Sequence, residues 1–286
     1  MRRGVSPKPP VPFVVIFTDL DGSLLDQRTY KWEEAKPALN RCKRLQVPLI
    51  LVSSKTRAEI DVLRQELGLT SPFISENGGG IFFPEEGAHP VPPDTVLEHG
   101  LWKWSLGLPY HSLVQALREI RDELGWKIRG FSDMSLEEIS GLTGLNLEST
   151  RLASLREYDE PFVLVEEGEK DPDVLYDAAK QRGLSVTSGG RFYHLHGKND
   201  KGASVDKLVV WYGEHHSHIM SVALGDSPND FSMLKRVSHP VLIRSSRQFS
   251  ELQAMIPALR VTKEKGPKGW NAAVSEVLRK HIPGSH

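Results

Sequence analysis

Two aspartates follow directly on an apolar segment near the beginning of the chain. The motif is Asp19-Leu20-Asp21-Gly22-Ser23, and it comes after the β-branched and aromatic residues 12–18. The two carboxylates alternate along an extended backbone, and Gly22 permits a sharp turn after them. One carboxylate can attack phosphorus while the other transfers protons, provided that a cation offsets their repulsion. Aspartate and glycine are also common in ordinary turns, so a structural interpretation stays open for this motif alone.

Two further groups could bind a phosphoryl group. The first is Ser53-Ser54-Lys55-Thr56-Arg57, which begins at the end of a second apolar segment. The Ser53 hydroxyl could donate to a phosphoryl oxygen, whereas Ser54 or Thr56 could equally cap a helix. The second is Lys201, whose charge would neutralise phosphate and relieve the crowding of carboxylates, with Lys198 as a competing candidate.

A fourth group has the composition of a cation site. It is Gly225-Asp226-Ser227-Pro228-Asn229-Asp230, and it follows the apolar residues 219–224. Two carboxylates and an amide suit a hard, oxygen-preferring cation such as Mg²⁺. Asp226 or Ser227 could instead cap a helix, although the preceding glycine and the Asp-x-x-x-Asp spacing leave that explanation less complete.

The elements that must position these groups alternate between strands and helices. Apolar segments without polar alternation are expected to be strands buried on both faces. The expected order is strand, helix, strand, helix, strand over residues 12–18, 32–45, 48–53, 57–67 and 72–75. Helix, strand, helix and strand return over residues 202–212, 219–224, 231–234 and 240–243. This pattern predicts an α/β fold, a doubly wound and mostly parallel sheet with its ligand site at the carboxyl ends of the strands.

The middle of the chain has a different pattern and is expected to form an inserted α+β cap. Its expected helices cover residues 111–124, 135–141, 145–156 and 174–182, and its expected strands cover residues 161–165, 184–187 and 191–195. The predicted organisation is a flexible leader over residues 1–12, a core domain over 13–83 and 198–286, and a cap domain over 84–197. His194 and His196 share one strand face, but nothing else in the sequence completes a site around them.

The bulk composition excludes some partners. The chain has 286 residues, 39% of them hydrophobic and 26% charged, with a formal net charge of -1. No global field attracts it to nucleic acid or to an anionic membrane, and no apolar run reaches transmembrane length. Cys42 is the only cysteine, so no intrachain disulfide can form, and a cytoplasmic location is expected. The expected partner is a small molecule; oligomeric state is not indicated.

In this order and on this sheet, the four groups resemble the motifs of the haloacid dehalogenase superfamily of phosphohydrolases. Residues 19–25 are similar to its first motif, with Ser23 where threonine is usual, and Ser53, Lys201 and residues 225–230 are similar to the other three. Ser75-Glu76-Asn77-Gly78-Gly79 is similar to a loop of members whose α+β cap is inserted late, the Cof-type class IIB. The resemblance covers both halves of the predicted core.

The resemblance implies a mechanism. Asp19 would attack phosphorus to form an aspartyl phosphate, while Asp21 would protonate the leaving oxygen and then activate water. Mg²⁺ would be bound by Asp19, the backbone carbonyl of Asp21 and Asp226, with Asp230 as a ligand or a support. Ser53 and Lys201 would stabilise the phosphoryl oxygens.

A narrower resemblance, to the mannosyl-3-phosphoglycerate phosphatases, is carried by residues 52–57, 139–145, 156–162 and 188–195. It implies a hexosyl-3-phosphoglycerate substrate, mannosyl or glucosyl. Gly189 and Gly190 would let backbone N–H groups approach an anion, and the Arg191 guanidinium could bind the glycerate carboxylate in a bidentate manner, although a hairpin turn with an exposed arginine is equally compatible. The remaining substrate-binding candidates are Ser54, Lys55, Asn77 and Asn229.

Three alternatives to this function stay open. The first is a sugar phosphatase of other specificity, for example one resembling sucrose phosphatase. The second is a phosphomutase, which would return the phosphoryl group to the sugar instead of releasing it. The third is a binding module without turnover, which the filling of all four motif positions disfavours. Glu157 or Glu160 could hydrogen-bond sugar hydroxyls, or could lie on a solvated helix end.

Overall fold

The computed structural model describes residues 11–87, 90–165, 171–189, 191–246 and 249–282. The chain divides into two compact units, which we call the first unit (Met1–Ile50 and Val205–His286) and the second unit (Leu51–Ser204). Most of the predicted leader, and also Gly190, lie outside the described residues. Among the helices that the structure describes, none is long and apolar enough to cross a membrane. The predicted cap boundaries at residues 84 and 197 stay a prediction, since the second unit also takes in residues 51–83.

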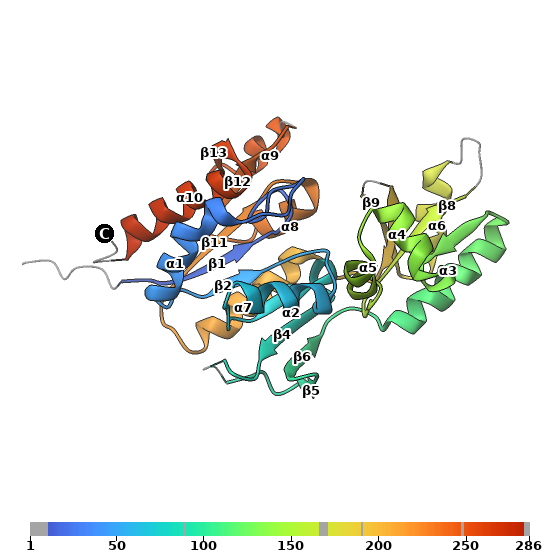
Figure 1. Ribbon diagram of the computed structural model, residues 1–286, viewed down its shortest axis with the longest axis horizontal. Helices are drawn as coiled ribbons and strands as arrows, with labels where there is room; N and C mark the ends of the chain where they lie inside the picture. Colours follow the sequence, from blue (N-terminus) through green and yellow to red (C-terminus); the bar gives the residue numbers. More distant parts are fainter. Residues whose placement is uncertain (1–10, 88–89, 166–170, 190, 247–248, 283–286) are drawn as a thin grey trace, which may run out of the picture. The chain divides into compact units, whose positions relative to one another are not determined.

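The first unit is built on the predicted parallel sheet (Figure 1). The strand order is β13-β12-β11-β1-β2, with β1 at Phe13–Thr18, β2 at Leu49–Leu51, β11 at Ile219–Gly225, β12 at His239–Arg244 and β13 at Arg260–Lys265. β1, β11, β12 and β13 pair in parallel. The helices are η1 at Glu33–Ala35, α1 at Lys36–Arg44, η4 at Pro228–Asp230, α8 at Phe231–Leu234, α9 at Ser250–Met255 and α10 at Gly266–His281, while α7 at Lys201–Gly213 begins in the second unit.

The centre of this sheet is apolar on both faces, which explains the lack of polar alternation in its sequence. Val15, Ile16 and Phe17 of β1 are completely buried. On the side of α10, the buried Trp270 donates from its Nε1 atom to Thr18 Oγ1 at 2.9 Å, so a tryptophan fixes the last residue of β1. Helices α1 and α10 pack on each other (Figure 1), and the amide of Ala38 donates to Asn271 Oδ1 at 2.9 Å.

The second unit contains two antiparallel sheets (Figure 1). One has the order β3-β4-β6-β5, with β3 at Phe73–Ser75, β4 at Gly80–Pro84, β5 at Val96–Glu98 and β6 at Leu101–Ser105. The other has the order β7-β8-β10-β9, with β7 at Ile128–Gly130, β8 at Asp159–Leu164, β9 at Ser185–Gly189 and β10 at Phe192–His196. The helices are α2 at Arg57–Glu66, η2 at Glu76–Gly78, α3 at Tyr110–Leu124, η3 at Phe131–Asp133, α4 at Leu136–Thr143, α5 at Leu147–Ala153 and α6 at Pro172–Gln181.

The helices predicted for the inserted segment are confirmed as α3, α4, α5 and α6. Apolar residues of α3 and α6, such as Leu117 and Leu175, pack with Phe162 and Leu195 of the β7-β8-β10-β9 sheet in one core. The predicted strand at residues 72–75 is confirmed as β3, but its partner is β4, in antiparallel pairing, and only an isolated parallel bridge joins Ile74 to Val52.

Candidate active site

Three buried carboxylates lie together at the carboxyl ends of the central strands of the first unit. One oxygen from each of Asp19, Asp226 and Asp230 lies within 4.8 Å of the others, and the three residues are 6%, 5% and 0% exposed. The register explains this proximity, because Thr18 of β1 pairs with Leu224 of β11 and each strand then ends in its aspartate loop. The amide of Asp19 donates to the Leu224 carbonyl at 2.9 Å, which aligns the two loops.

The loop after β1 passes unusually close to the Asp226 carboxylate. Gly22 has a φ of +80°, and a Cβ atom at this position would lie 2.5 Å from Asp226 Oδ2. Only glycine fits both the left-handed backbone and that approach. The loop is closed by the amide of Gly22, which donates to the Leu25 carbonyl at 2.9 Å, and by the amide of Leu25, which donates to the Leu20 carbonyl at 2.8 Å.

Asp230 fixes the second acidic loop. Its Oδ2 atom accepts the amides of Asp226 at 3.0 Å and Ser227 at 3.1 Å. Ser227 is the N-cap residue of η4 and shares a capping box with Asp230, so of the two capping residues considered Ser227 is confirmed. Gly225 is required beside it, because a Cβ there would lie 2.5 Å from the Asp230 Cβ. Asn229 accepts a short hydrogen bond from the Ser227 hydroxyl at the exposed rim.

This arrangement has the properties of a metal centre. Three ionised carboxylates held this close in a buried setting repel one another unless a cation compensates them. Their oxygens are hard donors of the kind that Mg²⁺ and Ca²⁺ prefer, and the Gly22 backbone leaves room for the Asp226 carboxylate to complete a small cradle. The described residues of the first unit therefore fit a bound divalent cation.

The second unit joins the Ser53 group and the Asn77 loop into one hydrogen-bonded structure. Ser53 is 1% exposed; its Oγ accepts the Lys55 amide at 3.2 Å, and its carbonyl accepts the Asn77 amide at 2.9 Å. The amide of Glu76 donates to the Lys55 carbonyl at 3.0 Å. Asn77, with a φ of 53°, lies in the left-handed region that asparagine tolerates better than most residues.

Lys201 and Lys198, the two candidate lysines, differ sharply in burial. Lys201 is 1% exposed at the beginning of α7, whereas Lys198 is exposed. The beginning of this helix packs on the Asn77 loop, since Ser204 Oγ donates to the Gly78 carbonyl at 2.9 Å. Lysines are almost never fully buried unless they are paired, so burial favours Lys201 as the functional one.

Glu76 is a buried carboxylate to which the sequence analysis gave no role. It is completely buried at a φ of 47°, and its carboxylate accepts the amides of Glu157 at 3.0 Å and Tyr158 at 2.8 Å. Burial raises the pKa of Glu76 to about 8, although the nearby Arg156 guanidinium and the two backbone amides act in the opposite direction and lower this pKa. Glu76 therefore attaches the Asn77 loop to the segment that leads into β8.

The same segment supplies a charged cluster that the sequence analysis did not find. His194 Nδ1 lies 2.8 Å from Asp159 Oδ2, and the Arg156 Nη1 atom lies 3.3 Å from the same oxygen and donates to the Ser54 carbonyl at 3.0 Å. Burial by itself would raise the pKa of Asp159, but His194 and Arg156 together hold that pKa below its ordinary value. The sequence does not show this cluster, because Asp159 and His194 come together only when β8 pairs with β10. That pairing places Asp159 opposite His196 and Pro161 opposite His194.

The cluster borders a small cavity of about 140 Å³. Ser54, Lys55, Arg156 and His194 give it polar walls. Phe131 and Phe192, in edge-to-face contact at 5.3 Å, give it an apolar wall. Its lining therefore combines polar groups with an aromatic face, as small-molecule sites do.

The other residues named for the cap have separate surroundings. Arg191 is exposed and donates from Nη1 to the Leu142 carbonyl at 3.1 Å. Glu160 is completely buried and its carboxylate accepts hydrogen bonds from Tyr110 and Ser132, so the solvated helix end considered for it is wrong. Glu157 forms an ion pair with Arg57 at 2.7 Å.

Known proteins are similar to this chain in sequence or in fold. A family model described as haloacid dehalogenase-like hydrolase matches residues 16–93. A "Glucosyl-3-phosphoglycerate/mannosyl-3-phosphoglycerate phosphatase" of Methanococcoides burtonii is 40% identical over 268 residues, 93% of this chain and 98% of the relative. A "Mannosyl-3-phosphoglycerate phosphatase" of Pyrococcus horikoshii is 34% identical, covering 87% of this chain and 99% of the relative. A crystal structure of a Thermoplasma acidophilum protein matches 94% of this chain and 98% of its own, with a TM-score of 0.65 at 18% identity.

Proposed function

The chain belongs to the haloacid dehalogenase-like hydrolases, and we propose that it hydrolyses mannosyl-3-phosphoglycerate, and also glucosyl-3-phosphoglycerate, to the hexosylglycerate and inorganic phosphate. The relative at 40% identity is named for both substrates and the relative at 34% identity for the mannosyl compound, and the alignments cover 98% and 99% of these relatives. The observation that carries the proposal is the buried group of Asp19, Asp226 and Asp230, placed at the strand ends where such a sheet binds its ligand.

In the proposed mechanism Asp19 is the nucleophile. A carboxylate oxygen of Asp19 forms a bond to phosphorus while the bond from phosphorus to the glycerate oxygen breaks, and Asp21 gives its proton to that oxygen. Asp21, now ionised, then takes a proton from the water that attacks the aspartyl phosphate, which regenerates Asp19 and releases phosphate. Asp19, the Asp21 backbone carbonyl and Asp226, with support from Asp230, would hold Mg²⁺, whose positive charge would offset the carboxylates and the phosphoryl oxygens.

We assign the phosphoryl oxygens to Ser53 and Lys201. A buried hydroxyl and a buried ammonium can donate to an anion without first losing their contact with bulk water, which makes their contribution larger than on a surface. The support for this assignment is their burial, at 1% exposure each, and the fixed backbone on either side of Ser53. Asn77 and Asn229 are proposed as additional polar contacts to the substrate.

We assign the sugar-acid part of the substrate to the second unit. The cavity walls formed by Ser54, Lys55 and His194 offer donors to hydroxyl and carboxylate groups. Arg191, together with Gly189 and Gly190, is proposed to bind the glycerate carboxylate. Arg156 already donates to Ser54 and contacts Asp159, so its part is to hold this wall in place.

Phosphate release tests the proposal directly. We expect Mg²⁺-dependent release from mannosyl-3-phosphoglycerate to exceed release from a panel of simple sugar phosphates. Release from the simple phosphates alone would keep Asp19 and Asp21 in their roles and remove the substrate assignment. An isomerised sugar phosphate without free phosphate would indicate a mutase, and the absence of any Mg²⁺-dependent turnover would contradict an enzyme. The cytoplasmic location stays a prediction.

A further inference from the structure

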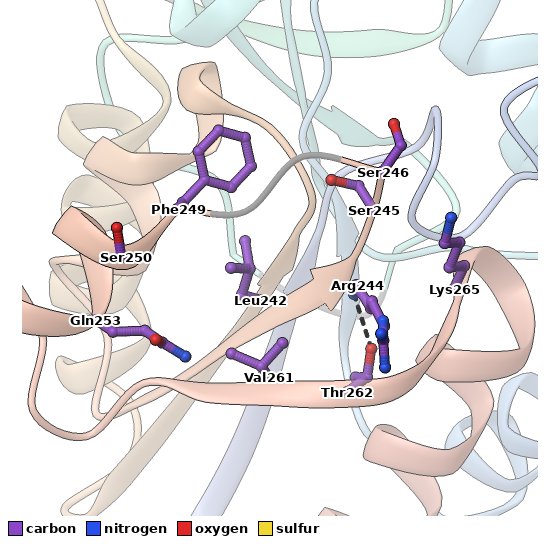
Figure 2. Close-up of a pocket in the computed structure, with 10 residues that line it drawn as sticks. All are labelled: Leu242, Arg244, Ser245, Ser246, Phe249, Ser250, Gln253, Val261, Thr262 and Lys265. Carbon is purple, nitrogen blue, oxygen red and sulfur yellow. Dashed lines mark hydrogen bonds between the residues drawn. The ribbon is translucent and has the colours of Figure 1, made fainter.

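The first unit contains a hollow that shares no lining residue with the acidic cluster. It has a volume of about 500 Å³, within the usual range for small-molecule sites, and lies between β12, β13 and α9 (Figure 2). Figure 2 shows Leu242 and Val261 across its middle, Phe249 at one end, and Arg244 and Lys265 at the other. The hollow therefore has an apolar, aromatic end and a basic end.

The basic end carries uncompensated charge. Arg244 and Lys265 face each other in the register of β12 and β13, where two like charges disfavour the pairing. Within the described part of the chain neither forms an ion pair; Arg244 reaches only the Lys263 carbonyl, at 3.5 Å. Charges on edge strands often serve to prevent aggregation, which explains Lys265 on the edge strand β13 but not Arg244, since β12 is an inner strand between β11 and β13.

An irregularity in the pairing brings these two cations together. Leu242 pairs with Val261 and Arg244 with Lys265, so the single residue between them on β12 faces three residues of β13. Thr262 stabilises this bulge: its Oγ1 accepts the Arg244 amide at 2.9 Å and donates to the Glu264 carbonyl at 2.7 Å (Figure 2). Bulges of this kind redirect side chains and occur often beside binding sites.

The hollow lies at the same edge of the sheet as the proposed catalytic loops. Gly225 of β11 pairs with Leu242 of β12, so Asp226 and Arg244 extend from the same end of neighbouring strands. On the other side, the residue after Lys265 approaches the first motif, since a Cβ on Gly266 would lie 4.0 Å from the Gly22 carbonyl oxygen. The carboxyl edge of a parallel sheet is where ligands of such folds bind.

We propose that this hollow is a second, non-catalytic site for a small organic phosphate that carries a flat ring. The phosphate lies between Arg244 and Lys265, whose charges it compensates, and the ring lies against Leu242, Val261 and Phe249. Neither the acidic cluster nor the cavity in the second unit combines unpaired cations with an aromatic wall in this way. The site does not depend on the identity of the phosphatase substrate.

Adenosine 5′-monophosphate is a suitable probe, because it joins a flat ring to a dianion. We would titrate it into the full chain by calorimetry in EDTA, which prevents turnover, with adenosine and ribose 5-phosphate as probes that lack one of the two parts. We expect adenosine and ribose 5-phosphate to bind more weakly than adenosine 5′-monophosphate. The Arg244→Gln/Lys265→Gln variant should bind it at least about tenfold more weakly, because two charge-assisted contacts are removed.

The matched control is Arg260→Gln/Lys268→Gln, which removes the same charge from the first unit outside the hollow, where these residues pair with Glu276 and Glu264. It should change the affinity by less than about twofold. Both double variants should keep phosphate release from mannosyl-3-phosphoglycerate, which confirms folding. Four outcomes would overturn the proposal. They are an equal loss of affinity in the two variants, no loss of affinity in either, binding of adenosine as tight as that of adenosine 5′-monophosphate, and no binding of adenosine 5′-monophosphate up to about 10 mM, which would correspond to very weak affinity.

Discussion

The buried carboxylate of Glu76 gives the molecule a pH-dependent stability that one substitution should remove. Burial raises its pKa from 4.5 to about 8. Between these two pH values the unfolded chain has lost a proton that the folded chain still holds, so stability falls as the pH rises and is constant above about 8. The shift corresponds to a ceiling of about 5 kcal/mol, at about 1.4 kcal/mol for each pH unit.

Replacing Glu76 with glutamine keeps the shape of the protonated acid and removes the titration. Its carbonyl oxygen can accept the amides of Glu157 and Tyr158, which now bond to the carboxylate. We expect the free energy of unfolding of Glu76→Gln to equal that of the wild type near pH 5 and to exceed it by about 2–4 kcal/mol at pH 9. This range is lower than about 5 kcal/mol because the structure around the charge relaxes.

Urea unfolding at a series of pH values from 5 to 9, followed by tryptophan fluorescence, measures this difference. The control is Glu137→Gln, which removes an exposed carboxylate of the same unit and should leave the pH dependence unchanged. A difference between Glu76→Gln and wild type that stays constant with pH would refute the reasoning. An advantage of the wild type that grows with pH would show that Arg156 and the backbone amides keep Glu76 ionised in the folded chain.

Three further substitutions test the carboxylates and the first loop. Asp19→Asn should reduce phosphate release by at least about a thousandfold. In EDTA it should also raise the free energy of unfolding by about 1 kcal/mol, because one of three crowded charges is removed. Gly22→Ala should raise the Mg²⁺ concentration for half-maximal release about 10–100-fold, since its Cβ meets Asp226 Oδ2 at 2.5 Å. Asp159→Asn should lower the free energy of unfolding in urea by about 3 kcal/mol at pH 7, because Arg156 loses its carboxylate partner. This loss of stability should shrink as the pH falls below about 4. An unchanged urea midpoint would contradict the buried pairing.

The parallel sheet could be predicted from the sequence because its physical signal is local and strong. β1 and β11 are short apolar runs buried on both faces, and each is followed at once by an aspartate loop. Parallel strands end at the same edge, so placing the loops on the sheet already brings Asp19 near Asp226. The cluster of three carboxylates in the structure follows from that topology.

The strands that were not predicted lack such a signal. β13 has the sequence RVTKEK and is exposed along most of its length, because it lies at the edge of the sheet and pairs on one side only. β4 begins with a glycine and ends with a proline, residues typical of loops, and these obscure the short apolar run of Ile81, Phe82 and Phe83 between them. For β13, the backbone pairing with β12 rather than the side-chain pattern indicates a strand.

The interactions around Asp159 and His194 could not be found from the sequence for a different reason. The two residues are 35 positions apart and belong to β8 and β10, so only the antiparallel register brings them within hydrogen-bond distance. The sequence alone does not show which residue a single histidine on a strand will contact. Glu76 is similar, since its partners are backbone amides, which every residue possesses.

The distribution of the proposed site residues separates two tasks. The residues that fit a divalent cation, Asp19, Asp226 and Asp230, are all in the first unit, where Gly22 and Gly225 permit contacts that any side chain would prevent. Holding three carboxylates together there costs free energy that a cation compensates, so this arrangement is explained by ligand binding rather than by stability. Ser53 and Lys201 belong to the second unit, together with the loop anchored by Glu76. The residues that fit a cation therefore all belong to the first unit, and the residues proposed for the phosphoryl oxygens belong to the second.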